Sequence, residues 1–192
     1  MRFNALIVAV CLLAVGGLAA LQPVREALGL ALDDSLQLAL IHAELAMAPL
    51  LFIPALGTRH SVVSNLTTGA ACWAAAAAVV LLFSFASMGD LGWETRSLSA
   101  AVWLACVGTL SLAARVGSIW VGRTRVALLC LFGLPPLWHY LMLEYSGVSG
   151  ARMKSLSPNW GLATHELTLW PLIVLGLLCI GVAVAIPNRE RA

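Results

Sequence analysis

TTGAACWAAAAAVVLLFSFASM, residues 67–88, contains no charged side chain. A helix needs about 20 mostly apolar residues to cross the hydrocarbon core of a bilayer, which is about 30 Å thick. The stretch therefore predicts a membrane-spanning helix. Its small residues, Gly69-Ala-Ala and the alanines 74–78, let another backbone approach closely, so we expect this helix to be packed against others.

Similar apolar windows recur along the whole chain, which is 61% hydrophobic and 10% charged, with a mean hydropathy of +0.94. In soluble domains, roughly 45–50% of residues are hydrophobic and about 25% are charged. Five more windows approach the length of a span, at residues 4–22, 36–56, 98–114, 126–143 and 167–187. The sequence predicts an all-α fold: one membrane domain over residues 1–192, a polytopic helix bundle with about six transmembrane helices.

Basic residues beside the spans predict the orientation, because arginine and lysine are retained on the cytoplasmic side. With the N-terminus inside, the inner segments hold Arg2, Arg59, Arg115, Arg123, Arg125, Arg189 and Arg191. The outer segments hold Arg25, Arg96, Arg152 and Lys154. This bias predicts both termini in the cytoplasm, and we expect a bacterial cytoplasmic (inner) membrane.

The first window also has the features of a signal peptide. Arg2 precedes an apolar core that ends in the small residues Gly17-Leu-Ala-Ala. A retained first span is favoured because the apolar run is long. Cleavage would leave five spans and an outside N-terminus.

Three ionisable side chains fall inside predicted spans: His42, Glu44 and His139. Such groups cost about 2.5–3.5 kcal/mol on insertion scales, so each is a candidate functional residue. The favoured interpretation is that His42 and Glu44 satisfy each other or a neighbouring helix, that His139 belongs to the interface, and that no cofactor binds. In the alternative, a metal, haem or proton site lies near the outer surface, with His42 and His139 as ligands and Glu44 as a carboxylate partner.

Prolines inside spans predict helix bends: Pro49 and Pro54 in the second span, and Pro135 and Pro136 in the fifth. Each removes a backbone hydrogen bond that neighbouring groups or water must replace. A static bend is favoured over a hinge.

No catalytic motif is present. H-E-x-x-H, G-x-S-x-G, C-x-x-C, Walker A and dinucleotide-binding patterns are all absent, so no catalytic residue is predicted and any ATP hydrolysis belongs to another chain. The five cysteines, each in an apolar run, predict no metal site and are interpreted as small hydrophobes. The net charge of +2 is scattered, which argues against binding to nucleic acid.

The predicted outer loop, residues 144–166, is the most distinctive segment. It has a glycine-serine turn followed by Leu156-Ser-Pro-Asn-Trp-Gly-Leu, and we expect it to fold back on the bilayer surface and to cap the outer end of the bundle. Its candidate residues are Arg152, Lys154, Pro158, Trp160, His165 and Glu166.

A proline-bearing fifth span, an outer loop with Leu-Ser-Pro and a last span with a short basic tail make residues 126–192 similar to the end of an ABC-2-type permease subunit. The resemblance implies six spans per subunit, half of a dimeric export channel, and a separate ATPase on the cytoplasmic face. The first half departs from that family, because no amphipathic helix precedes the first span and only residues 57–66 separate the second from the third.

The leading hypothesis is a transport-type, permease-like membrane subunit that works in the lipid bilayer as a homo- or hetero-oligomer, with a cytoplasmic ATPase as a candidate partner. The second is a small membrane subunit or assembly factor of a respiratory complex or of a complex that handles haem or metal. A structural anchor is the third, and an enzyme acting alone is disfavoured.

Overall fold

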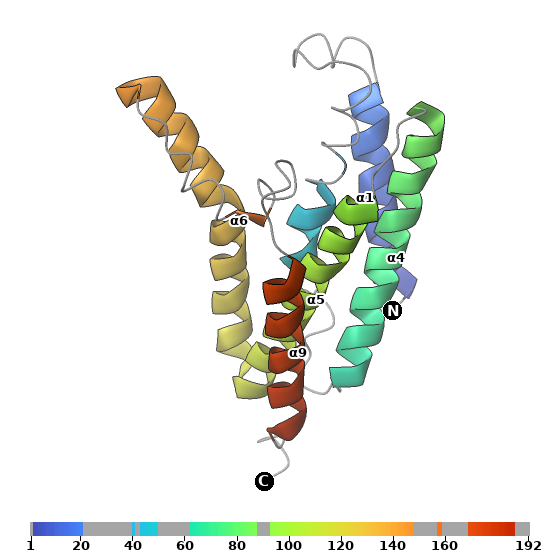
Figure 1. The fold of residues 1–192 in the computed structure, drawn as a ribbon. Coiled ribbons are helices and arrows are strands. Elements are labelled where there is room, and N and C mark those ends of the chain that lie inside the picture. Colours follow the sequence, from blue (N-terminus) through green and yellow to red (C-terminus); the bar gives the residue numbers. More distant parts are fainter. Residues whose placement is uncertain are drawn as a thin grey trace.

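The computed structural model describes residues 2–20, 40, 43–49, 62–87, 93–147, 157–158 and 169–186. The regular secondary structure of these residues is helical and includes no strand. The five long helices are α1 (Arg2–Ala20), α4 (Val62–Ser87), α5 (Trp93–Val116), α6 (Ser118–Ser146) and α9 (Leu169–Ala185) (Figure 1). Leu40 and residues 43–49 are also helical. The predicted all-α class is confirmed for the described part of the chain.

Among the described residues, three helices are long and apolar enough to cross a membrane: Val62–Phe83, Arg96–Val116 and Ser118–Ser146. Two shorter apolar stretches, Ala5–Gly17 and Trp170–Ala185, lie in α1 and α9. By length and composition, therefore, the chain has the character of a helical membrane protein. The six-span count and the orientation stay predictions.

From α4 onward, successive long helices run in alternating directions along the bundle. In Figure 1, α4 and α6 run upward, whereas α5 and α9 run downward. Helix α5 contacts α4, α6 and α9, and α1 contacts α4. Of the three long apolar helices, α5 is the most buried and α6 the most exposed. Helix α5 is thus the element on which the others are assembled.

Glycine residues allow the backbones of α5 and α9 to come into direct contact. A Cβ atom on Gly108 would lie 2.6 Å from the carbonyl oxygen of Gly176, and one on Gly176 would lie 3.0 Å from that of Leu104. No side chain fits at either position without moving a backbone. Small residues at the contact allow the dispersion packing that holds helices together in lipid.

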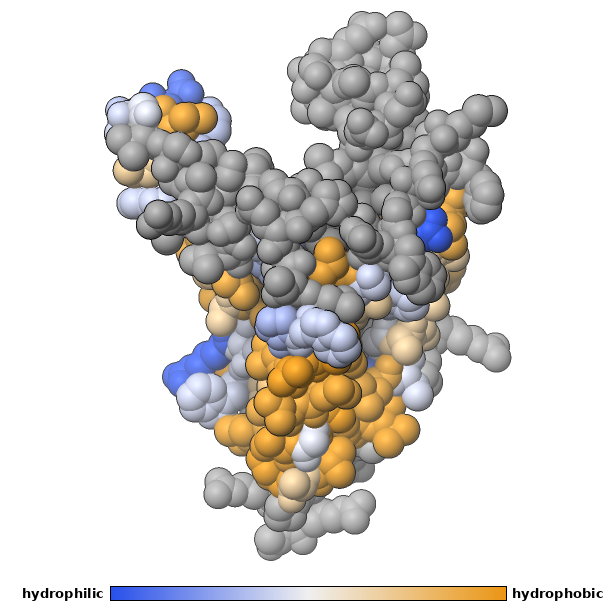
Figure 2. Space-filling view, viewed as in Figure 1, coloured by the Kyte–Doolittle hydropathy of each residue, from blue (hydrophilic) through white to orange (hydrophobic). Residues whose placement is uncertain are grey.

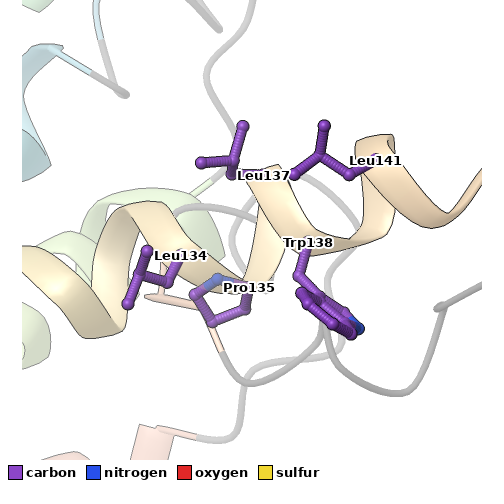
Figure 3. Close-up of a pocket in the computed structure, with 5 residues that line it drawn as sticks. All are labelled: Leu134, Pro135, Leu137, Trp138 and Leu141. Carbon is purple, nitrogen blue, oxygen red and sulfur yellow. The ribbon is translucent and has the colours of Figure 1, made fainter. Parts of the chain in front are cut away.

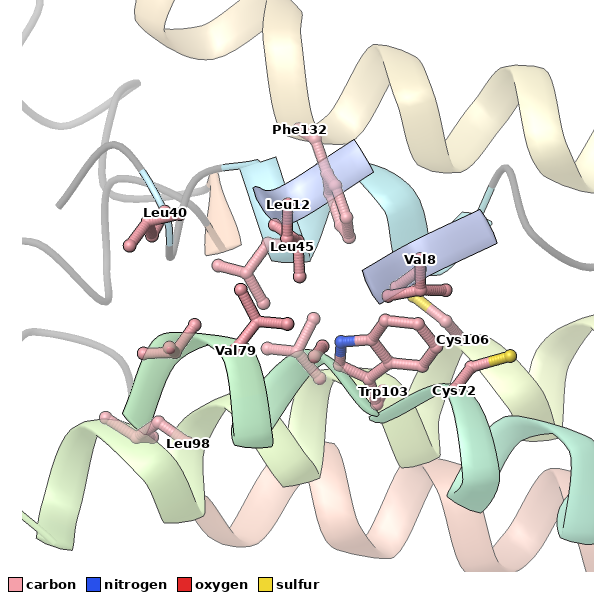
Figure 4. Packing of buried hydrophobic residues seen from close by; sticks show 14 residues of the cluster. Val8, Leu12, Leu40, Leu45, Cys72, Val79, Leu98, Trp103, Cys106 and Phe132 are labelled. Atoms are coloured by element: carbon pink, nitrogen blue, oxygen red, sulfur yellow. The ribbon is translucent and has the colours of Figure 1, made fainter. Parts of the chain in front are cut away.

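A hydrophobic cluster fills the interior between α1, α4, α5, α6 and the helical residues 43–49 (Figure 4). Trp103 is its largest member, and the free thiols of Cys72 and Cys106 are buried beside it. The other residues labelled in the figure are Val8, Leu12, Leu40, Leu45, Val79, Leu98 and Phe132. The burial of these two cysteines agrees with their interpretation as small hydrophobes.

Helices α5 and α6 are separated by Gly117 alone. Its φ of 152° is accessible to glycine and strained for other residues. The N–H of Gly117 donates to Ala113 O at 3.0 Å, and its carbonyl accepts from the N–H of Trp120 at 3.0 Å. Residues 115–125, predicted as a connection between spans, are therefore helical apart from this glycine, and Arg123 and Arg125 belong to α6.

We expect Gly176→Leu to separate α5 from α9, because the new side chain would collide with the backbone of α5. Overpacking of this kind costs about 1–3 kcal/mol. For a chain of this length the melting temperature in detergent should fall by about 2–4 °C for each kcal/mol. Gly181→Leu is the matched control on the same helix, since nothing lies within 4 Å of that position. Equal melting temperatures for the two variants would contradict the assigned contact.

Candidate functional site

The bend of α6 is the first feature of the candidate site. Pro135 and Pro136 lie inside α6, which continues through both. Proline has no N–H, so the carbonyls four residues earlier, at Leu131 and Phe132, lose their usual helical partners. Figure 1 shows α6 changing direction between its yellow and its orange part, as expected for a helix bent by proline.

Ser157 supplies the hydrogen bond that Pro136 cannot make. Its hydroxyl donates to the carbonyl oxygen of Phe132 at 2.7 Å, and Ser157 is 0% exposed. A buried carbonyl without a partner costs about 1–3 kcal/mol, and more in hydrocarbon. The serine of Leu-Ser-Pro therefore stabilises the bend of a helix 25 residues away in the sequence.

This bond brings part of the predicted outer loop to the middle of α6. With a rise of about 1.5 Å per residue, Phe132 lies about 21 Å from the start of a helix about 42 Å long. Ser157 and Pro158 are both buried there, and Figure 1 shows their short ribbon beside α6. These two residues thus enter the bundle, whereas the sequence predicted a loop on the bilayer surface.

An apolar hollow of about 320 Å³ lies beside the bend (Figure 3). It is lined by residues from the C-terminal half of α6: Leu134, Pro135, Leu137, Trp138 and Leu141. Their spacing places them along one half of the helix circumference. With Trp138 about half exposed, this half of α6 presents apolar surface to lipid or to another helix.

Glu44 and Ser99 form the second feature, a buried polar pair. The hydroxyl of Ser99, on α5, donates to Oε1 of Glu44 at 2.6 Å. Glu44 is 3% exposed and belongs to the helical residues 43–49. The hydroxyl of a neighbouring helix thus satisfies this carboxyl group, which agrees with one of the two partners expected for it.

Two buried donors flank Ser99 on the same face of α5. The indole N–H of Trp103, one turn after Ser99, and Nε of Arg96, one turn before it, have no hydrogen-bond partner in the part of the chain that the structure describes. Unpaired buried donors are costly. Two donors beside the Glu44–Ser99 pair thus lack an acceptor among the described residues.

The remaining predicted residues are placed only in part. Pro49 is fully buried at the end of the described residues 43–49. For Pro136 and His139 the structure describes only the backbone, within α6. The other candidates lie outside the described residues: His42, Pro54, Arg152, Lys154, Trp160, His165 and Glu166.

The described residues contain no group of three or more His, Cys, Asp or Glu side chains that could hold a metal ion. His42 is not among those residues, so its proposed pairing with His139 at a haem or metal stays a prediction.

Sequence reasoning missed the partners of these polar groups. Ser99 and Ser157 carried no prediction of their own, and neither did the second buried pair, in which Asn65 Nδ2 donates to Ser111 Oγ at 3.4 Å. One feature of the sequence could have pointed to Ser157. It directly precedes Pro158, in the segment that follows the proline-bearing span.

No protein-family model, no curated protein and no solved structure matches this chain. The similarity of residues 126–192 to ABC-2-type permeases therefore rests on the residues quoted above.

We expect Ser157→Ala to lower the free energy of unfolding by about 1–2 kcal/mol, because the Phe132 carbonyl would lose its donor. The same substitution should cost much less in a Pro136→Ala background, where residue 136 again has an N–H to donate. Thermal unfolding of the four proteins in detergent gives the coupling energy.

Ser146→Ala is the control for this cycle, since among the described residues that exposed hydroxyl bonds to Met142 of its own helix. It should change stability by less than about 0.5 kcal/mol. An equal cost of Ser157→Ala in both backgrounds would rule out the assigned role.

Glu44→Ala and Ser99→Ala should each destabilise the protein, and together by less than the sum of the two. The difference should be about 1 kcal/mol or more, because both remove the same buried hydrogen bond. Glu44→Gln keeps the accepting oxygen and should remain closest to the parent. The exposed Glu144→Ala is the control. Additive losses, measured by thermal unfolding, would show that the two side chains do not interact.

Proposed function

We propose that this chain is a transport-type subunit of a bacterial cytoplasmic membrane, which crosses the bilayer six times with both termini in the cytoplasm and works with partner chains. The observation that carries the proposal is the hydrogen bond from Ser157 to the proline bend of α6. Bent or broken helices and non-helical backbone at membrane depth recur where transporters bind or pass their substrates.

The bend favours a transport subunit over a purely structural anchor. Interrupting the hydrogen bonds of a helix costs free energy, and an anchor gains nothing from the interruption. A straight helix satisfies its own backbone, whereas α6 depends on a hydroxyl group from another segment. A single hydrogen bond that closes a bend can open and close again within a rigid bundle. Such a bond suits a helix that moves during a transport cycle, so the proposal takes the hinge rather than the static bend that the sequence favours.

Exposed apolar surface supports the oligomer. Helix α6 carries many large exposed side chains, Trp138 and Tyr140 among them, and α9 adds Trp170 and Leu178. Figure 2 shows a broad hydrophobic surface in the region of α9. In a bilayer, lipid or other membrane helices cover such faces. A hollow beside the α6 bend offers a second chain a concave place to pack.

The positions of the arginines and the directions of the helices support the proposed orientation in the membrane. Arg115, Arg123 and Arg125 lie around the turn at Gly117, which agrees with a cytoplasmic end there. Helices α5 and α9 run opposite to α4 and α6 (Figure 1). That pattern is compatible with an even number of crossings.

Purification from native membranes in mild detergent tests the proposal. We expect the tagged chain to elute above monomer mass and to bring with it an ATPase subunit that carries a Walker A motif, identified by mass spectrometry. The Ser157→Ala chain should assemble equally well but support less ATP hydrolysis by the complex, and Ser146→Ala should support the parent rate. A stable monomer without an ATPase would contradict the proposal.

A further inference from the structure

The turn between α5 and α6 gathers three arginines within a short length of chain. Arg115 lies in the last turn of α5, and Arg123 and Arg125 lie in the first turns of α6. The acidic residues of these two helices, Glu94 and Glu144, are at the far ends. The end of this hairpin therefore has a positive charge that its own two helices do not neutralise.

Arg125 lies on the face of α6 that packs against the bundle. Val121, Leu128 and Phe132, at helical spacing from it, are members or neighbours of the hydrophobic clusters. Nε and Nη2 of Arg125 are buried and have no hydrogen-bond partner among the residues that the structure describes. A guanidinium group in apolar surroundings is costly unless an anion pairs with it.

The depth of Arg125 matches that of a lipid headgroup. It lies about 10 Å along α6 from Ser118, and α6 exceeds a hydrocarbon core of about 30 Å by about 6 Å at each end. The Cα atom is thus a few ångströms below the boundary, and an arginine side chain can reach across that distance. The residue is partly exposed, so a group from the membrane can approach it.

The neighbouring surface is suited to lipid. The guanidinium carbon of Arg123 lies 5.1 Å from the centre of the exposed Trp120 ring, a cation–π pair of the kind found where aromatic residues mark the membrane interface. Toward the middle of α6, Val126 and Leu129 expose apolar side chains that acyl chains can cover.

We propose that the α5–α6 turn binds the phosphate of an anionic phospholipid, with Arg125 as the principal ligand. The guanidinium fork donates charge-assisted hydrogen bonds to the phosphate oxygens, and Arg115 and Arg123 add positive charge. A soluble phosphate has the same oxygens but no acyl chains. The exposed apolar side chains beside the arginines favour the lipid as the source.

Melting temperatures in a neutral detergent test this site. Added phosphatidylglycerol should raise the melting temperature of the parent by about 4 °C or more, since a ligand that binds only the folded state stabilises it. Phosphatidylcholine with the same acyl chains, and inorganic phosphate, should raise it by much less. Arg125→Gln should lose at least half of the phosphatidylglycerol shift, with Arg125→Lys between it and the parent.

Arg96→Gln is the control for charge and for burial, because Arg96 also has a buried Nε without a partner among the described residues but lies at the other end of α5. It should keep the full lipid response. Native mass spectrometry of the parent should show phosphatidylglycerol retained in preference to phosphatidylcholine, a readout that does not depend on whether Arg125→Gln folds.

Three results would overturn the proposal. One is equal retention of the two lipids by the parent. Another is equal loss of the lipid response in Arg96→Gln and Arg125→Gln. The third is stabilisation by inorganic phosphate as large as that by phosphatidylglycerol, which would assign the site to a soluble phosphate.

Discussion

Hydrocarbon offers no hydrogen bonds, and this constraint governs the chain at each level. It makes helices the economical conformation for the apolar stretches, because a helix pairs its own N–H and C=O groups. It also makes each interruption of this backbone pairing costly. Two prolines interrupt the pairing in α6, and Ser157 donates to the Phe132 carbonyl to repair part of it. Ser157 must therefore lie against the middle of α6.

The hydrocarbon of the bilayer also determines which forces hold the helices together. Lipid is as apolar as the side chains, so association depends on close packing rather than on escape from water. Helices α5 and α9 achieve it where Gly108 and Gly176 remove both side chains from the contact. Helix α6 meets the bundle mainly through its inner face, at Val121, Leu128 and Phe132. The rest of its apolar surface is left for lipid or for another chain.

The bundle has few polar side chains, and Glu44 and Arg125 lie in two different surroundings. Glu44 and Ser99 lie on facing helical segments and satisfy each other. Arg125 lies near a helix end, and two of its nitrogens are buried without a hydrogen-bond partner among the described residues. A group inside the bundle can be satisfied by a facing helix, as Glu44 is by Ser99, whereas one near the membrane boundary can use the membrane itself.

The sequence by itself determined the helical class and the approximate position of most helices, since an uncharged apolar run such as residues 67–88 has one economical conformation in a bilayer. It also located the α6 bend, because proline cannot donate. Only the tertiary structure decided which group repairs that bend, that Ser99 is the partner of Glu44, and that one glycine rather than a loop joins α5 to α6. The physical reason is that hydrophobic pattern is local in the chain, whereas the partners of Phe132 and Glu44 are 25 and 55 residues away, and packing alone brings them within bonding distance.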